Sequence, residues 1–165
     1  MSEEKFDRGS TVTKEYLQYR EQVLNYTNKD MNLTLDNDEQ VYIAVFDIPL
    51  KSNIIGFQTQ TLALVFGLNT HIYHGSGRVM VNLERNEKVM KAMQSLLISS
   101  HQVLKSMELV DNTDYYESTN VRAYLKTGKG IYFKELEKGI KEDEFLMTLM
   151  NYVLREIAES QGKTT

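Results

Sequence analysis

The spacing of the apolar residues changes along this chain, and this change limits the possible folds more than any other feature. Between residues 86 and 107 apolar side chains recur three and four positions apart, which predicts one long amphipathic helix. Elsewhere the apolar residues come in short runs rich in β-branched and aromatic side chains, as is typical of strands. The chain therefore combines helices with strands.

The other elements follow from the same two patterns. Helical spacing predicts further helices over residues 13–27 and 143–159. Strands are expected over residues 41–46, 57–66, 70–74, 121–125 and 131–136, with the third interrupted by a glycine turn at 75–77 and resumed at 78–82. Connections of hairpin length favour antiparallel pairing. We predict an α+β fold with the order helix, three antiparallel strands, helix, two-strand hairpin, helix, in which the sheet packs on the helices.

Length and composition are those of one globular domain. The chain has 165 residues, of which 41% are hydrophobic and 25% are charged, and this is enough to bury a core without covalent cross-links. Its one proline, Pro49, and its lack of low-complexity tracts give no sign of a linker. We expect a single domain over residues 11–160, with flexible ends at 1–10 and 161–165.

Charge and cysteine content exclude several classes of function. Without cysteine the chain has no disulfide, no thiolate metal site and no cysteine nucleophile. The first residues carry acidic side chains where a secretory signal would be apolar, and no segment approaches the roughly 20 apolar residues of a membrane span. The net charge of −4 and the scattered basic residues disfavour nucleic acid as a partner. We expect a cytoplasmic protein without a membrane partner.

No motif in the chain has the spacing of a catalytic, metal or phosphate site. His71 and His74 are three residues apart, but on a strand such residues point to opposite faces, so they cannot chelate one metal ion. The glycine turns at 75–77 and 128–130 lack the spacing of a nucleophile elbow or a phosphate-binding loop. The carboxylates and tyrosines at 111–117 are typical of a solvated connection. We predict no catalytic residue, no metal ligand and no cofactor.

One polar patch is a candidate ligand site. Five side chains that can bind a ligand lie close together in the sequence around the glycine turn at 75–77: Asn69, His71, Tyr73, His74 and Arg78. Binding residues are often placed on loops in this way. The alternative is an exposed hairpin tip that binds nothing.

The predicted helix over residues 86–107 has a wider apolar band than one sheet face needs. The excess width indicates a second buried partner, and a twofold dimer is a common way to bury a helix face. The corresponding dimer-interface residues are Met90, Met93, Leu97, His101 and Leu104. The alternative is that the helices at 13–27 and 143–159 cover both edges of the band within one chain.

The order of elements over residues 13–159 resembles that of class I type III secretion chaperones and the related YbjN-type proteins, which are small, often acidic bacterial proteins. The resemblance lies in topology and size rather than in a motif. It implies that the helix at 86–107 helps to form a homodimer and that residues 121–136 supply the last hairpin. It also implies that an unfolded segment of a partner protein wraps over apolar patches on the subunit surface.

Two functions therefore stay open. The first is a non-enzymatic protein-binding module, a homodimeric chaperone or adaptor that holds an extended client segment. The second is a small ligand-binding domain or enzyme that uses the patch at residues 69–78. A pocket that brings a histidine within hydrogen-bond reach of a carboxylate would favour the second.

Overall fold

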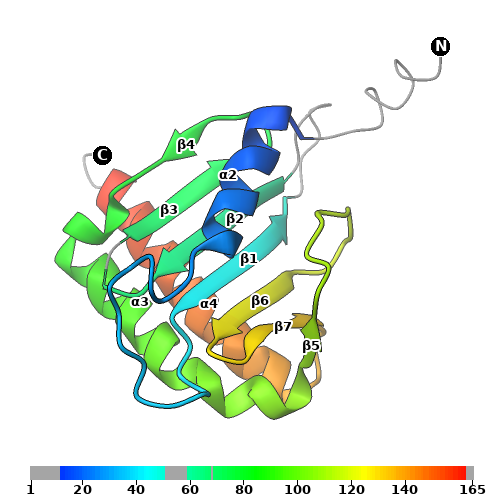
Figure 1. Cartoon of the computed structure of the whole chain (residues 1–165). Coiled ribbons are helices and arrows are strands. Elements are labelled where there is room, and N and C mark those ends of the chain that lie inside the picture. The colour runs from blue at the N-terminus through cyan, green and yellow to red at the C-terminus, as the bar shows by residue number, and fades with distance from the viewer. Residues whose placement is uncertain (1–11, 51–58, 68, 163–165) are drawn as a thin grey trace.

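The computed structural model describes residues 12–50, 59–67 and 69–162. These residues form one antiparallel sheet of seven strands, with one helix on one face and two helices on the other (Figure 1). The strand order is β4-β3-β2-β1-β6-β7-β5. This arrangement confirms the predicted α+β fold, although the described residues contain more strands than expected.

The elements have the following bounds. The helices are α2 (Lys14–Asn25), α3 (Glu87–Ser99) and α4 (Lys141–Gly162), together with the 3-10 helices η1 (Leu83–Arg85) and η2 (Ser100–Ser106). The strands are β1 (Ile43–Pro49), β2 (Thr59–Val65), β3 (Asn69–His74), β4 (Val79–Met80), β5 (Glu108–Val110), β6 (Arg122–Thr127) and β7 (Gly130–Glu135). Among the described residues, no helix has an apolar stretch long enough to cross a membrane.

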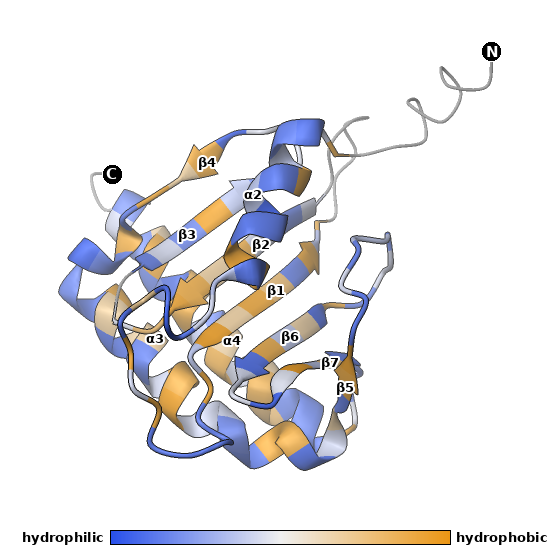
Figure 2. Cartoon of the chain, in the orientation of Figure 1, coloured by the Kyte–Doolittle hydropathy of each residue, from blue (hydrophilic) through white to orange (hydrophobic). Residues whose placement is uncertain are grey.

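Strand β1 forms the centre of the sheet and is buried on both faces. It pairs with β2 on one side and with β6 on the other, and every side chain from residue 43 to residue 48 is buried. Because side chains alternate along a strand, Ala44 and Phe46 join the core with α3 and α4, whereas Ile43 and Val45 join the core with α2. The apolar run in β1 (Figure 2) is therefore the pattern of a strand that is covered on both sides.

Helices α3 and α4 cover one face of the sheet. The helix predicted over residues 86–107 is divided, because α3 ends at Ser99 and the chain continues as the 3-10 helix η2. The hydroxyl groups of Ser100 and Ser106 donate to carbonyl oxygens three residues earlier, at 3.4 and 2.8 Å. Serine hydroxyls commonly compete with α-helical bonding in this way. The expectation of one continuous helix is therefore wrong in its last turns.

Helix α2 covers only part of the opposite face. Its N-terminus is capped by Thr13, whose hydroxyl accepts a hydrogen bond from the main-chain N–H of Tyr16 (3.2 Å). Tyr16, Val23 and Leu24 pack in a core with side chains of β1, β2 and β3. Over β6, β7 and β5, no helix of the described part of the chain covers this face (Figure 1). There the connection between β5 and β6 takes the place of a helix, because its Tyr115 packs against the core that contains Tyr16 and Tyr124.

The strands at the two edges of the sheet are short. β4 follows the glycine turn at 75–77, where Gly77 has a φ of 98°, and it keeps only two residues of the continuation predicted at 78–82. β5 pairs with β7 but is three residues long. The sequence pattern does not predict β5, because three residues are too few to show an alternation.

The predicted ends of the domain are only partly described. At the C-terminus α4 runs through Gly162, so the first two residues of the tail expected at 161–165 belong to the helix. Residues 1–10 and 163–165 lie outside the described residues, as do the first two residues of the strand predicted at 57–66.

Candidate binding sites

The structure divides the predicted ligand patch between the two faces of the sheet. Asn69, His71 and Tyr73 lie on the face that α2 covers, whereas His74 lies on the face of α3 and α4, as strand alternation requires. Arg78 is exposed just before β4. The two histidines therefore lie on opposite faces, as predicted. Across the described residues, His, Asp and Glu side chains form no group of three that could hold a metal ion.

The three residues on the α2 side line a small hollow of about 210 Å³ between α2 and β3. The Nδ1 atom of His71 accepts a hydrogen bond from the main-chain N–H of Asn82 (3.2 Å), and burial lowers the pKa of His71. Burial also raises the pKa of Tyr73 to about 12. The lining consists of tyrosine, amide, imidazole and apolar side chains without a carboxylate, so it does not form an acid–base pair.

The predicted dimer-interface residues lie mainly inside the monomer. Met93, Leu97 and Leu104 are 0, 2 and 5% exposed, in the core that α3 and η2 share with α4 and the sheet. Met90 is half-buried at the edge of this core, and His101 is exposed. The wide apolar band is thus explained within one chain by the last helix and the sheet, while α2 lies on the other face. The homodimer itself stays a prediction.

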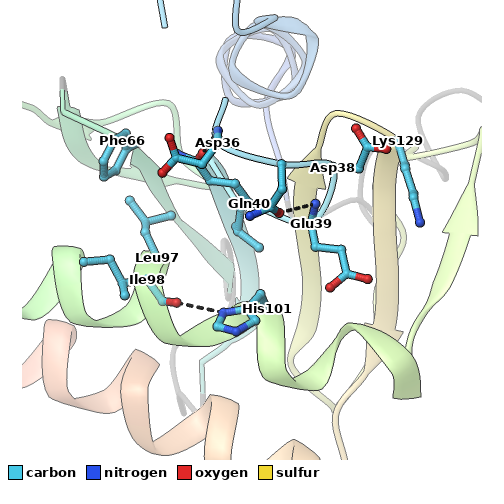
Figure 3. Close-up of a pocket in the computed structure, with 11 residues that line it drawn as sticks. Asp36, Asp38, Glu39, Gln40, Phe66, Leu97, Ile98, His101 and Lys129 are labelled. Atoms are coloured by element: carbon cyan, nitrogen blue, oxygen red, sulfur yellow. Dashed lines mark hydrogen bonds between the residues drawn. The ribbon is translucent and has the colours of Figure 1, made fainter. Parts of the chain in front are cut away.

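A groove beside the end of α3 is the largest of the hollows described here. It has a volume of about 590 Å³ and lies between residues 36–41 and the helical residues 97–101. Its floor is apolar and consists of Val41, Phe66, Leu97 and Ile98. Figure 3 shows Phe66, Leu97 and Ile98 grouped on one side of this space. Val41 and Leu97 are each 2% exposed, whereas Ile98 is 64% exposed and Phe66 is half-buried, so the accessible apolar surface comes mainly from Ile98 and Phe66. We call this site the loop–helix groove.

The wall that residues 36–39 give to the loop–helix groove is acidic. Asp36, Asp38 and Glu39 line it together with a single lysine, Lys129. Side-chain acceptors hold the turn that carries these carboxylates. The main-chain N–H of Asp36 donates to Gln40 Oε1 (2.6 Å), and that of Glu39 donates to Asn37 Oδ1 (2.8 Å). Within the described residues none of these carboxylates forms an ion pair. The wall therefore carries negative charge that a basic partner can neutralise.

A second site lies beside α2, where no helix covers the sheet, above a buried ion pair. Asp47 of β1 has no exposed side-chain surface, and its Oδ2 atom lies 2.8 Å from Nη2 of Arg20. Arg20 Nε donates to both carboxylate oxygens at 3.0 and 3.1 Å, and the hydroxyl of Thr61 donates to Oδ1 at 2.7 Å. Such bidentate geometry satisfies a carboxylate that would otherwise be costly to bury.

A second buried arginine extends this cluster. Arg122 of β6 donates to the main-chain carbonyl of Asp47 at 3.3 Å and to that of Tyr116, while its Nε atom has no partner among the described residues. The ring of Tyr115 lies over both guanidinium groups, 5.7 Å from Arg20 Cζ and 5.6 Å from Arg122 Cζ. The aromatic rings thus form a layer over the buried cations.

Above this layer is a hollow of about 410 Å³, which we call the tyrosine hollow. Its lining residues are Glu108, Val110, Asn112, Asp114, Tyr115, Tyr116, Tyr124 and Phe133. The hydroxyl of Tyr116 donates to Glu135 Oε2 (2.6 Å) at the edge of this region, and this bond is the main reason that the pKa of Glu135 lies below its ordinary value. Burial raises the pKa of Tyr124 to about 12.

The sequence alone does not reveal the tyrosine hollow. The residues at 111–117 match a solvated connection, yet Tyr115 packs edge-to-face on Tyr16 at 5.6 Å between ring centroids. The arginines and the aspartate beneath it come from positions 20, 47 and 122. One local signal was present, namely an aspartate inside the apolar run of β1, which requires a buried partner.

No protein-family model, curated protein or solved structure matches this chain. The resemblance to secretion chaperones therefore rests on the order of elements and stays a prediction.

Proposed function

We propose that this protein is a non-enzymatic protein-binding module that holds an extended segment of a partner protein in the loop–helix groove. The observation that carries this role is the groove of about 590 Å³, in which exposed Ile98 extends an apolar floor. Exposed apolar surface with a polar rim is typical of protein interaction sites. The chaperone resemblance implies that a client segment wraps over apolar patches on the subunit surface, and the groove is such a patch.

The chemistry of the groove favours a partner segment with both apolar and basic side chains. An apolar side chain would bury Ile98 and the floor, and full burial of one such side chain stabilises a complex by about 1.5–3 kcal/mol. Lys or Arg side chains beside it would face Asp36, Asp38 and Glu39. Charges at a rim contribute mainly to association rate and to the choice of partner.

Three synthetic peptides test this preference directly. We would compare the binding of fluorescein-labelled twelve-residue peptides of alternating Leu-Lys, Leu-Glu and Ser-Lys by fluorescence anisotropy. The Leu-Lys peptide should bind at least tenfold more tightly than the other two, because only it matches both the apolar floor and the acidic wall. Equal binding of the Leu-Glu peptide would contradict the charge argument.

A matched pair of variants distinguishes peptide binding in the groove from nonspecific electrostatic attraction to an acidic protein. Ile98→Glu places a charge on the groove floor, and Leu17→Glu adds the same charge at an exposed apolar position on α2. We expect Ile98→Glu to weaken Leu-Lys binding at least tenfold, while Leu17→Glu leaves it within twofold. Equal effects of the two variants would contradict binding of the peptide in the loop–helix groove.

The small-ligand alternative has one observation in its favour. Asn69, His71 and Tyr73 line a common hollow beside α2. Its volume of about 210 Å³ lies below the roughly 300–1,000 Å³ of most ligand pockets. A fragment screen by NMR would support this alternative if hits shift the resonances of β3 and α2 together.

A further inference from the structure

Aromatic rings and carboxylates line the tyrosine hollow in an arrangement that suits a cation. The rings of Tyr124 and Phe133 have centroids 5.0 Å apart at an angle of 44°, and those of Tyr116 and Phe133 are 6.4 Å apart at 63°. All three rings line the hollow. Cations bind against the faces of aromatic rings within about 6 Å of the centroid.

Buried groups hold the rings of the hollow in place. Arg20 Cζ lies 5.1 Å from the ring centroid of Tyr124, and Arg122 Cζ lies 5.5 Å from that of Tyr116. The hydroxyl of Tyr116 is also bonded to Glu135. A ligand that enters the hollow therefore meets rings that are already ordered, which reduces the entropic cost of binding.

The charge balance around the hollow is negative. Beneath the rings, Arg20 is paired with Asp47, and Arg122 stands opposite Glu135 in the register of β6 and β7. Glu108 and Asp114 add two further carboxylates to the lining, and neither forms an ion pair within the described residues. Arg122 forms no ion pair among the described residues. Asp47 and Glu135 nevertheless equal the two arginines in number, so Glu108 and Asp114 leave a surplus of negative charge that favours a cation over an anion.

We propose that the tyrosine hollow is a binding site for an alkylammonium group, carried by a small quaternary amine or by a lysine side chain. The volume of about 410 Å³ lies within the range of small-molecule sites. The aromatic rings contact the N-methyl or methylene groups, and Glu108 and Asp114 balance the charge. This site is separate from the loop–helix groove, with which it shares no lining residue.

Choline and its neutral isostere, 3,3-dimethylbutan-1-ol, test the need for a positive charge. Both would be titrated into the ¹⁵N-labelled full chain and followed by NMR. Choline should bind roughly 5- to 30-fold more tightly than the alcohol, as expected for a cation–π site, and should shift amides of β5, β6 and β7. Shifts confined to other elements would overturn the proposal. Equal affinity for the two compounds would exclude a small quaternary amine and leave a lysine side chain as the source of the ammonium group.

Two variants of one tyrosine isolate the aromatic contribution. Tyr116→Phe and Tyr116→Leu both lose the hydroxyl that bonds to Glu135, but only the leucine variant loses the ring. We expect Tyr116→Leu to weaken choline binding roughly three- to tenfold, and Tyr116→Phe, which keeps the ring but loses the bond that orders it, to weaken binding clearly less. Equal weakening by both variants would show that the ring does not bind the cation.

A second pair isolates the carboxylate contribution. Asp114→Asn removes a lining charge, whereas Asp111→Asn removes an exposed charge from the same connection outside the lining. Asp114→Asn should weaken choline binding roughly two- to fivefold and should not change binding of the alcohol. An equal effect of Asp111→Asn would mean general attraction to an acidic surface, which contradicts a defined site.

Peptides identify the source of the ammonium group. The same titration is repeated with a seven-residue peptide that carries trimethyllysine, lysine or norleucine at its centre. Tighter binding of a lysine-type peptide than of choline assigns the site to a protein segment, and the reverse order assigns it to a small amine. The proposal is overturned if neither choline nor either cationic peptide binds more tightly than its neutral counterpart. Ile98→Glu should leave all these affinities unchanged, so failure at one site is distinguishable from failure at the other.

Discussion

Asp47→Ala is expected to destabilise the fold strongly, because it removes the carboxylate that compensates the buried Arg20. Asp47 is fully buried and accepts hydrogen bonds from Arg20 Nε and Nη2 and from the hydroxyl of Thr61. Removal of one partner of a buried ion pair typically costs about 3–5 kcal/mol, since the other charge stays buried without compensation. For a chain of this size, this loss corresponds to a fall in Tm of roughly 6–20 °C.

Urea unfolding followed by far-UV circular dichroism would measure this loss. The double variant Arg20→Met with Asp47→Ala removes both charges, so it should be more stable than Asp47→Ala alone by about 2 kcal/mol. Arg122 can keep its bond to the main-chain carbonyl of residue 47 in both variants. Asp111→Asn, an exposed control, should stay within about 0.5 kcal/mol of the wild type.

Two results would refute this reasoning. One is a loss of less than about 1 kcal/mol for Asp47→Ala, which would mean that water or a local shift readily replaces the carboxylate. The other is a double variant that is less stable than Asp47→Ala, which would mean that Arg20 stabilises the fold by packing and not through its partner.

Three further predictions follow from burial and hydrogen bonding. Leu97→Glu should abolish the helical circular dichroism signal because Leu97 is buried, whereas Ile98→Glu should stay folded. If the predicted homodimer uses the exposed end of α3, light scattering will show a dimer for the wild type and a monomer for Ile98→Glu. The bond from Tyr116 lowers the pKa of Glu135 below its ordinary 4.5. This bond therefore stabilises the fold fully above pH 4.5, and the stabilisation is lost as pH falls through the lowered pKa. Between pH 6 and pH 3, the free energy of unfolding from urea curves should fall further for the wild type than for Tyr116→Phe, by up to about 1 kcal/mol. Asp143, in the first turn of α4, is buried and accepts hydrogen bonds from Lys134 Nζ and from the main-chain N–H of Glu137. Thermal unfolding of Asp143→Ala should therefore show a loss of about 2 kcal/mol in the free energy of unfolding, and Asp143→Asn should lose less.

The sequence predicts the elements where a single period persists over many residues. The apolar spacing around Met93 and Leu96 identifies α3, and the uninterrupted apolar run before Asp47 identifies a strand. The opposite orientations of His71 and His74 also follow from the alternation of a strand. In each case the prediction depends on a pattern among residues that are only a few positions apart in the sequence.

Features that depend on small local energies are predicted less well. The change from α3 to η2 at Ser100 involves hydroxyl groups that compete with main-chain bonds, and the apolar spacing is almost the same in both helix types. β5 is held by its pairing with β7, and three residues around Leu109 carry no pattern of their own. The width of the apolar band around Leu97 indicates burial but does not say whether a second subunit or α4 provides it.

The sequence by itself therefore determines the class of fold and the inward-facing residues of the longest elements, because these depend on spacing along the chain. Only the tertiary structure decides the candidate sites. It brings Arg20 and Arg122 to Asp47 beneath Tyr115, and it places the acidic turn beside Ile98. The positions of these residues relative to one another depend on the order of the strands and on where the helices lie, and both are decided by the packing of the whole chain.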